Sequence, residues 1–91
     1  MTRTVAEHLH RLHKSAAIHH LEMCKAHQKL AEHHAVSAPV AGRAHAEAAD
    51  SHGELADFHK AAARELEESH GIEGEKVEDF DTLRKALLGD V

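Results

Sequence analysis

The sequence predicts an all-α protein, in which a long antiparallel helical hairpin is followed by a short C-terminal helix. Residues 5–36 contain neither Gly nor Pro and are rich in Ala, Leu, Lys, Glu and His, a composition typical of helix. The chain has 91 residues, and its only proline, Pro39, lies near the middle of residues 1–70. Histidines recur every seven residues on both sides of this proline, and seven residues make two turns of an α-helix.

The first helix is expected over residues 4–36. Thr2 or Thr4 can cap its start, and Glu7 follows Thr4 at the spacing of a capping box. One broad face of the helix is apolar plus histidine, and the opposite side is mostly charged. Ile18 and Leu21 interrupt the charged side, which predicts a second contact there with a partner chain or with the C-terminal tail.

The second helix is expected over residues 39–70. Proline disfavours helix at the residue before it, so the turn is predicted at residues 37–39. Gly71 is suited to close the helix as a C-cap. Gly53 costs a helix interior about 1 kcal/mol, and a break there would leave three shorter helices. We expect the helix to continue, because the seven-residue register persists on both sides of Gly53.

Residues 1–71 therefore form the hairpin, and residues 72–91 form a linker and a short helix that ends at Leu88, before Gly89. This helix carries an apolar stripe at helical spacing: Val77, Phe80, Leu83 and Leu87. The stripe is expected to pack on the hairpin or on a second subunit. A docking helix for another protein is the alternative.

The histidines form one column on each predicted helix. The first column is His13, His20, His27 and His34, and the second is His45, His52 and His59. In an antiparallel hairpin, facing residues have a constant sum of positions. The sum of 79, whose midpoint falls at residues 38–40 beside the predicted turn, pairs His34 with His45, His27 with His52, and His20 with His59, and places His13 opposite Leu66. Most neighbours three and four positions away are uncharged, so the columns should point inward.

Inward imidazoles need partners, since burying an unpaired one costs about 1–3 kcal/mol. Neutral imidazole binds zinc, nickel and copper, so each facing pair is a candidate two-ligand site for a transition metal ion. The candidate ligands are His13, His20, His27, His34, His45, His52, His59 and Cys24. Cys24 is included because it lies one turn from His20 and His27, and Cys24, His27 and His52 would suit zinc or Cu(I).

Other interpretations of the same residues remain open. The columns fit a hydrogen-bonded core ladder without metal, or largely solvated histidines, and Cys24 fits a small buried apolar residue. Glu7 and His10, like Glu67 and His70, have the Glu-x-x-His spacing of di-iron bundles, but further glutamates on the inner face are missing. Facing histidines could also ligate haem, but the chain has few of the bulky side chains that enclose a porphyrin.

Composition narrows the function classes. The net charge is −5 without a cluster of Lys and Arg, which argues against nucleic acid and against anionic membranes as partners. No apolar stretch is long enough to cross a membrane, and the N-terminus lacks a signal-peptide core, so a cytoplasmic location is expected. The sequence contains no nucleophile–base arrangement and no phosphate-binding loop, so we do not expect an enzyme.

Large apolar side chains are few, and Phe58 and Phe80 are the only aromatic residues. So thin a core favours self-association of two hairpins into a four-helix bundle. A second chain would also supply a second histidine pair at each level. The sequence therefore predicts a homodimeric transition-metal-binding bundle for buffering, storage or delivery. The alternative is a non-enzymatic interaction or scaffold bundle whose buried histidines form a pH-sensitive hydrogen-bonded core.

Overall fold

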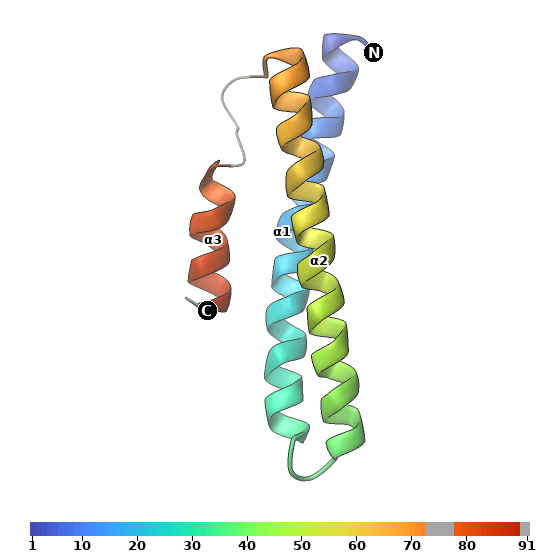
Figure 1. Cartoon of the computed structure of the whole chain (residues 1–91), viewed down its shortest axis with the longest axis vertical. Coiled ribbons are helices and arrows are strands. Elements are labelled where there is room, and N and C mark those ends of the chain that lie inside the picture. The colour runs from blue at the N-terminus through green and yellow to red at the C-terminus, as the bar shows by residue number, and fades with distance from the viewer. Residues whose placement is uncertain (73–77, 90–91) are drawn as a thin grey trace.

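The computed structural model describes residues 1–72 and 78–89, and all its regular structure in these ranges is helical. Helices α1 (Arg3–His34) and α2 (Pro39–His70) lie side by side in opposite directions, and α3 (Glu78–Leu88) lies along one side of the hairpin (Figure 1). The molecule is rod-shaped, with extents of 52 × 23 × 13 Å. The predicted all-α hairpin is confirmed.

Helix α1 begins after Thr2, whose side-chain Oγ1 accepts a hydrogen bond of 3.2 Å from the Val5 backbone N–H. Thr2 rather than Thr4 is therefore the cap. The helix ends at His34, two residues before the predicted end, and residues 35–38 make the turn. Within this turn the Ala38 N–H donates to the His34 carbonyl at 2.9 Å. The earlier end of α1 changes which residues of the two helices face each other.

Helix α2 runs unbroken through Gly53, as the sequence predicted, and this glycine is buried. A Cβ atom on Gly53 would lie 3.9 Å from the Cys24 sulfur. The helix ends at Gly71, which adopts the left-handed conformation at φ 57°. Glycine takes this conformation without steric cost, as the sequence predicted for the C-cap.

Small residues form the contact between the helices and allow α3 to pack beside them. Fully buried residues of the hairpin meet one aromatic ring of α3; the cluster is Ala17, Leu21, Ala56, Ala63 and Phe80. Leu83, Leu87 and Leu88 of α3 pack against this cluster. Leu21 thus makes the predicted second contact, and its partner is the C-terminal tail. Val77, the first residue of the predicted stripe, lies outside the described residues.

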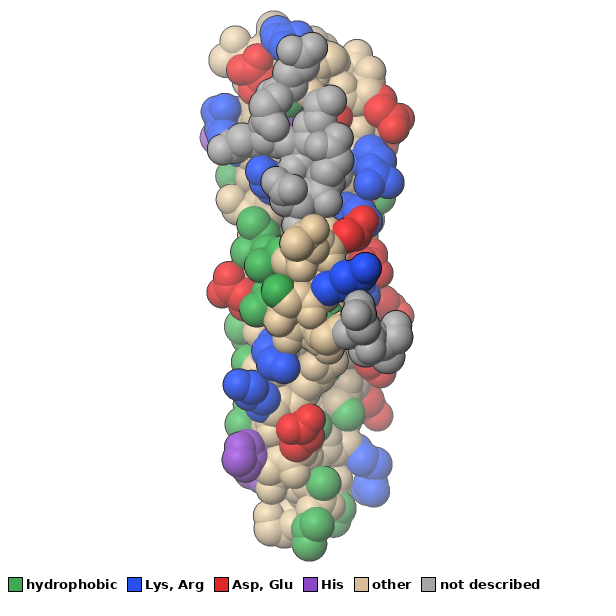
Figure 2. All heavy atoms as spheres, turned by 90° about the vertical axis from the view of Figure 1, so that its left-hand side faces the viewer, with side chains coloured by type: hydrophobic (Ala, Val, Ile, Leu, Met, Phe, Trp, Pro, Cys, Tyr) green, Lys and Arg blue, Asp and Glu red, His purple; other side chains and the backbone are tan. Residues whose placement is uncertain are grey.

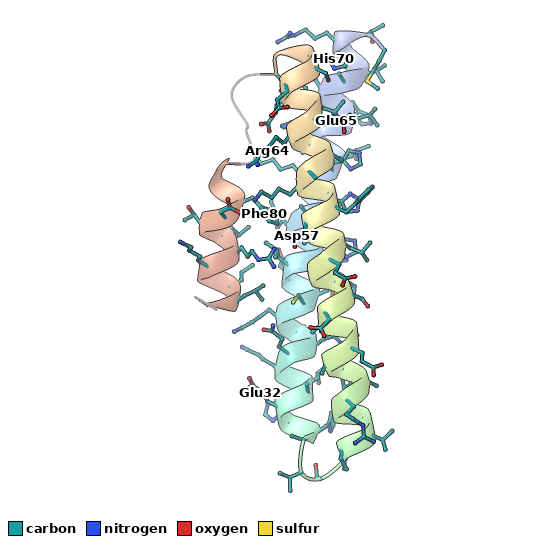
Figure 3. The ribbon with its side chains drawn as sticks, viewed as in Figure 1. Glu32, Asp57, Arg64, Glu65, His70 and Phe80 are labelled. Carbon is teal, nitrogen blue, oxygen red and sulfur yellow. The ribbon has the colours of Figure 1, made fainter. Side chains whose placement is uncertain are left out.

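Ion pairs border the contact between α2 and α3. Lys60 and Asp81 pair at 2.6 Å, and Arg84 pairs with Asp57. In Figure 3, Phe80 lies between α3 and the hairpin, and Asp57 lies on the side of α2 that faces α3. Such exposed pairs contribute about 0–1 kcal/mol each, so apolar packing supplies most of the attachment of α3.

Candidate functional site

The histidine columns meet along the seam between α1 and α2. Three pairs of rings face each other through their Nδ1 atoms: His13 and His59 at 2.9 Å, His20 and His52 at 2.9 Å, and His27 and His45 at 3.0 Å. These distances are those of hydrogen bonds, so the histidines of the two columns are partners of one another. We call this set of seven rings, His34 included, the histidine ladder.

The pairs that the sequence placed opposite each other stack instead. The ring centroids lie 5.5 Å apart for His20 and His59, 5.4 Å for His27 and His52, and 5.6 Å for His34 and His45, with interplanar angles of 6°, 10° and 17°. Each interior ring therefore bonds to one ring of the other helix and stacks on the next. The ladder is continuous from one end to the other.

The hydrogen-bonded register differs from the predicted one by one rung. The positions of the bonded pairs sum to 72, and His13 pairs with His59 rather than lying opposite Leu66. The cause is the turn: α1 ends at His34 and α2 begins at Pro39, so residues whose positions sum to about 73 face each other. Because both columns repeat every seven residues, a shift of one rung preserves the pairing.

Three rings of the ladder favour the neutral form more strongly than a free imidazole does. All seven histidines of the ladder are half-buried. Burial lowers the pKa of His20, His52 and His59 below the ordinary 6.5, and charges on neighbouring histidines lower it further. These neighbours are His59 and His19 for His20; His20, His27 and His19 for His52; and His13 for His59. A neutral ring keeps a nitrogen lone pair, which hydrogen bonding and metal binding both use.

Pairing through two Nδ1 atoms fixes the tautomers of a neutral rung. One ring carries its hydrogen on Nδ1 and donates it, and the other carries its hydrogen on Nε2 and accepts. Each rung therefore has one Nε2 lone pair and one Nε2–H to offer. Within residues 1–72 and 78–89, these six Nε2 atoms make no hydrogen bond.

The facing nitrogens are close to the spacing that a tetrahedral metal ion needs. Zinc binds imidazole nitrogen at about 2.0–2.1 Å, so two ligands at the tetrahedral angle lie about 3.3–3.4 Å apart. The observed separations of 2.9–3.0 Å fall short of this by a few tenths of an ångström. Successive rungs lie about 10.5 Å apart along the helices, so each would hold its own ion.

A single chain supplies only two ligands at each rung. Among the described residues, no group of three or more His, Cys, Asp or Glu side chains is arranged to hold a metal ion. Cys24 does not join His27 and His52, because it is buried beside Gly53 on the side of the hairpin near α3. Burial raises the pKa of its thiol. Its surroundings are those of a small buried core residue.

The structure also contains a polar pair that the sequence analysis did not identify. His10 is 2% exposed, and its Nε2 lies 2.7 Å from a carboxylate oxygen of Glu67, whose side chain is 10% exposed. Each residue belongs to one of the two Glu-x-x-His motifs, which the sequence suggested only as parts of a di-iron site. The positions of His10 and Glu67 sum to 77, which lies between the sums of 72 and 79 for the two registers of the ladder. This spacing is the signal in the sequence that could have identified the pair.

No protein-family model, curated protein or solved structure matches this chain. None of the described helices combines the length and apolar character required to cross a membrane. Function is therefore argued from the ladder itself.

Proposed function

We propose that this chain is a transition-metal-binding helical bundle that buffers, stores or delivers the ion, with the facing histidine pairs as ligands. The observation that supports this proposal is the set of three Nδ1 pairs at 2.9–3.0 Å, each close to the ligand spacing of a tetrahedral ion. Three similar two-ligand sites in a row suit the holding of several ions better than they suit a single catalytic centre.

Metal binding at a rung replaces the shared hydrogen. A neutral pair has two ring hydrogens, one on an Nδ1 and one on an Nε2. When an ion takes both Nδ1 lone pairs, both hydrogens reside on Nε2, so one ring changes tautomer and no proton is released. Uptake is therefore expected to be nearly independent of pH above the range where the histidines titrate, and to fail where they become protonated.

Two further ligands are needed at each tetrahedral site. Water can supply them, but a second copy of the chain would supply another histidine pair and also cover the thin core. We therefore include self-association into a four-helix bundle in the proposal. Zinc, nickel and copper all accept neutral imidazole, and the set of ligands does not favour one of them.

A second candidate function is an interaction bundle whose ladder needs no metal. It is supported by the completeness of the rungs, because each Nδ1 pair already lies at hydrogen-bonding distance. In the described residues, no buried side-chain nitrogen or oxygen lacks a hydrogen-bond partner. Such a ladder would stabilise the hairpin while its rings are neutral and weaken it on protonation.

Thermal unfolding of metal-free protein, produced without a histidine tag, separates the two candidates. We expect zinc at one hundred times its dissociation constant to stabilise the chain by about 2.7 kcal/mol for each occupied rung, and we expect a chelator to reverse this effect. Replacing His20 and His52 together by Leu removes the middle rung and should remove one site from the zinc stoichiometry. The matched control replaces His8 and His33, both exposed, by Leu.

The outcomes differ clearly. A melting temperature that does not change with zinc but falls on mild acidification favours the interaction bundle. A zinc stoichiometry that the control lowers as much as the ladder variant would show that surface histidines, rather than the rungs, bind the ion.

A further inference from the structure

The side of the hairpin away from α3 carries an uncovered apolar surface along the histidine ladder. Five large apolar side chains there are exposed, namely Val5 by 48%, Leu12 by 52%, Leu30 by 39%, Leu55 by 43% and Phe58 by 62%. We call these five residues together with the ladder the ladder face. Contiguous apolar surface of this kind marks an interaction site on most soluble proteins.

Helical geometry separates the ladder face from the side that α3 covers. Residues that pack under α3 lie four positions after a ladder histidine, as Ala17 and Ala56 do. The large exposed residues lie one position before or three positions after a ladder position, as Leu12 and Leu55 do. These positions are on opposite flanks of each helix. Helix α3 therefore leaves the ladder face bare.

The ladder face is almost free of charge. Each histidine column can be continued by seven residues, to Ala6 on α1 and to Leu66 on α2. Among all these column positions, the residues one position before them and the residues three positions after them, Glu65 is the one charged residue, although 30% of the chain is charged. By contrast, Lys, Arg, Asp and Glu side chains are spread over the side that carries α3 (Figure 2). A partner of the same composition can approach the ladder face without bringing like charges together, despite the net charge of −5.

The whole side of the hairpin that carries the ladder face is large enough for a stable dimer. Two helices of about 10 Å diameter and about 48 Å length make a face on the order of 1,000 Å². A standard protein interface buries about 800 Å² on each partner. At the open end of the hairpin this face is also hollowed, in a depression of about 370 Å³ lined in part by Leu9, His13 and Leu66.

We infer that the ladder face is covered by a second copy of this chain, whose histidine pairs complete four-imidazole levels; the metal role of these levels rests on the proposed function. Rungs spaced by seven residues, with the His20–His52 pair near the middle of both helices, stay in register across a two-fold axis.

Sedimentation equilibrium in chelator-containing buffer at pH 8 tests the interface without metal. We expect two chains per particle for the native protein and one for the variant Leu12→Glu/Phe58→Glu, with unchanged helicity by circular dichroism. The matched control is Val36→Glu/Val40→Glu, which adds the same two charges on side chains 94% and 71% exposed near the turn, and should leave two chains.

Zinc titration of the same three proteins then tests the four-imidazole levels. The native dimer should take up one ion per two chains at each rung, and the monomeric variant should bind zinc at least tenfold more weakly. A native protein that sediments as one chain at about 100 µM overturns the inference. So does a dimer that survives Leu12→Glu/Phe58→Glu, or a native monomer that co-sediments with phosphatidylcholine vesicles through this face.

The two proposals fail separately. A native dimer that takes up no zinc supports the interface and contradicts the metal function. A single chain that binds zinc with two ligands at each rung contradicts the interface and supports the metal function.

Discussion

Replacing Gly53 by alanine should stabilise the hairpin without touching the histidine ladder. Glycine in a helix interior is less stable than alanine by about 1 kcal/mol. The added Cβ would meet the Cys24 sulfur at 3.9 Å, an ordinary van der Waals contact, so no steric cost opposes this gain. We therefore expect Gly53→Ala to raise the free energy of unfolding by about 1 kcal/mol, or the melting temperature by about 4–8 °C in a domain of this size.

The measurement is thermal unfolding followed by far-ultraviolet circular dichroism in metal-free buffer. Protein concentration must be equal for all variants, because the proposed self-association would make the melting temperature depend on it. Gly42→Ala is the matched control. A Cβ there would lie 3.4 Å from backbone atoms of Ala31 and Ala35, which cannot rotate away as a side chain can. Gly42→Ala should therefore gain less than Gly53→Ala, or lose stability.

A lower melting temperature for Gly53→Ala than for the native protein would refute this reasoning. It would mean that an added Cβ atom lies closer to α1 than the 3.9 Å from the Cys24 sulfur, or that α2 is not helical at Gly53. The second possibility would also remove the basis of the ladder, because the rungs on the two sides of Gly53 share one register only if the helix is continuous.

Two further predictions concern the buried histidines. Because His20, His52 and His59 have pKa values below 6.5 when folded, their unfolded forms bind protons first. The stability that depends on these histidines should be fully present well above pH 6.5, fall as the pH decreases through about 6.5, and level off below the folded pKa values, as measured by urea unfolding. A stability independent of pH between 7 and 5 would contradict this. Glu67→Leu leaves His10 without its carboxylate and should cost about 1–3 kcal/mol, whereas Leu at exposed Glu68 should cost less than about 0.5 kcal/mol.

Local sequence signals predicted the elements well, because their causes are local. Absence of Gly and Pro gave α1, and Gly71 gave the end of α2, where the chain adopts positive φ. The register of the hairpin was less predictable. Two columns that both repeat every seven residues match in any register shifted by seven, and the turn at residues 35–38 selects among them. The predicted register had its midpoint at residues 38–40, whereas the observed midpoint between the end of α1 and the start of α2 lies between residues 36 and 37, and this difference moves the bonded pairs by one rung.

The side of each helix that becomes covered could not be predicted from the hairpin alone. Cys24 and Met23 lie four and three positions after His20, and both flanks are apolar in the sequence. Helix α3 decides between them by packing over Leu21, which buries Cys24 and leaves Met23 half-buried along the ladder. The same choice of flank keeps Cys24 away from His27 and His52, and thereby removes the three-ligand set that the sequence suggested.

The two sides of the hairpin solve the problem of a thin core in different ways. Toward α3, leucine and phenylalanine side chains cover the alanines permanently, and the buried His10 is paired with a carboxylate. Along the ladder, leucines in place of the histidines would give a continuous apolar surface that associates regardless of conditions. Imidazole makes the cover conditional, because the ring is nearly apolar in contact area when neutral, binds a metal ion through its lone pair, and is strongly hydrated when protonated. In the proposed dimer, a histidine seam would therefore couple assembly of the two chains to the occupancy of its ring nitrogens by protons or by metal.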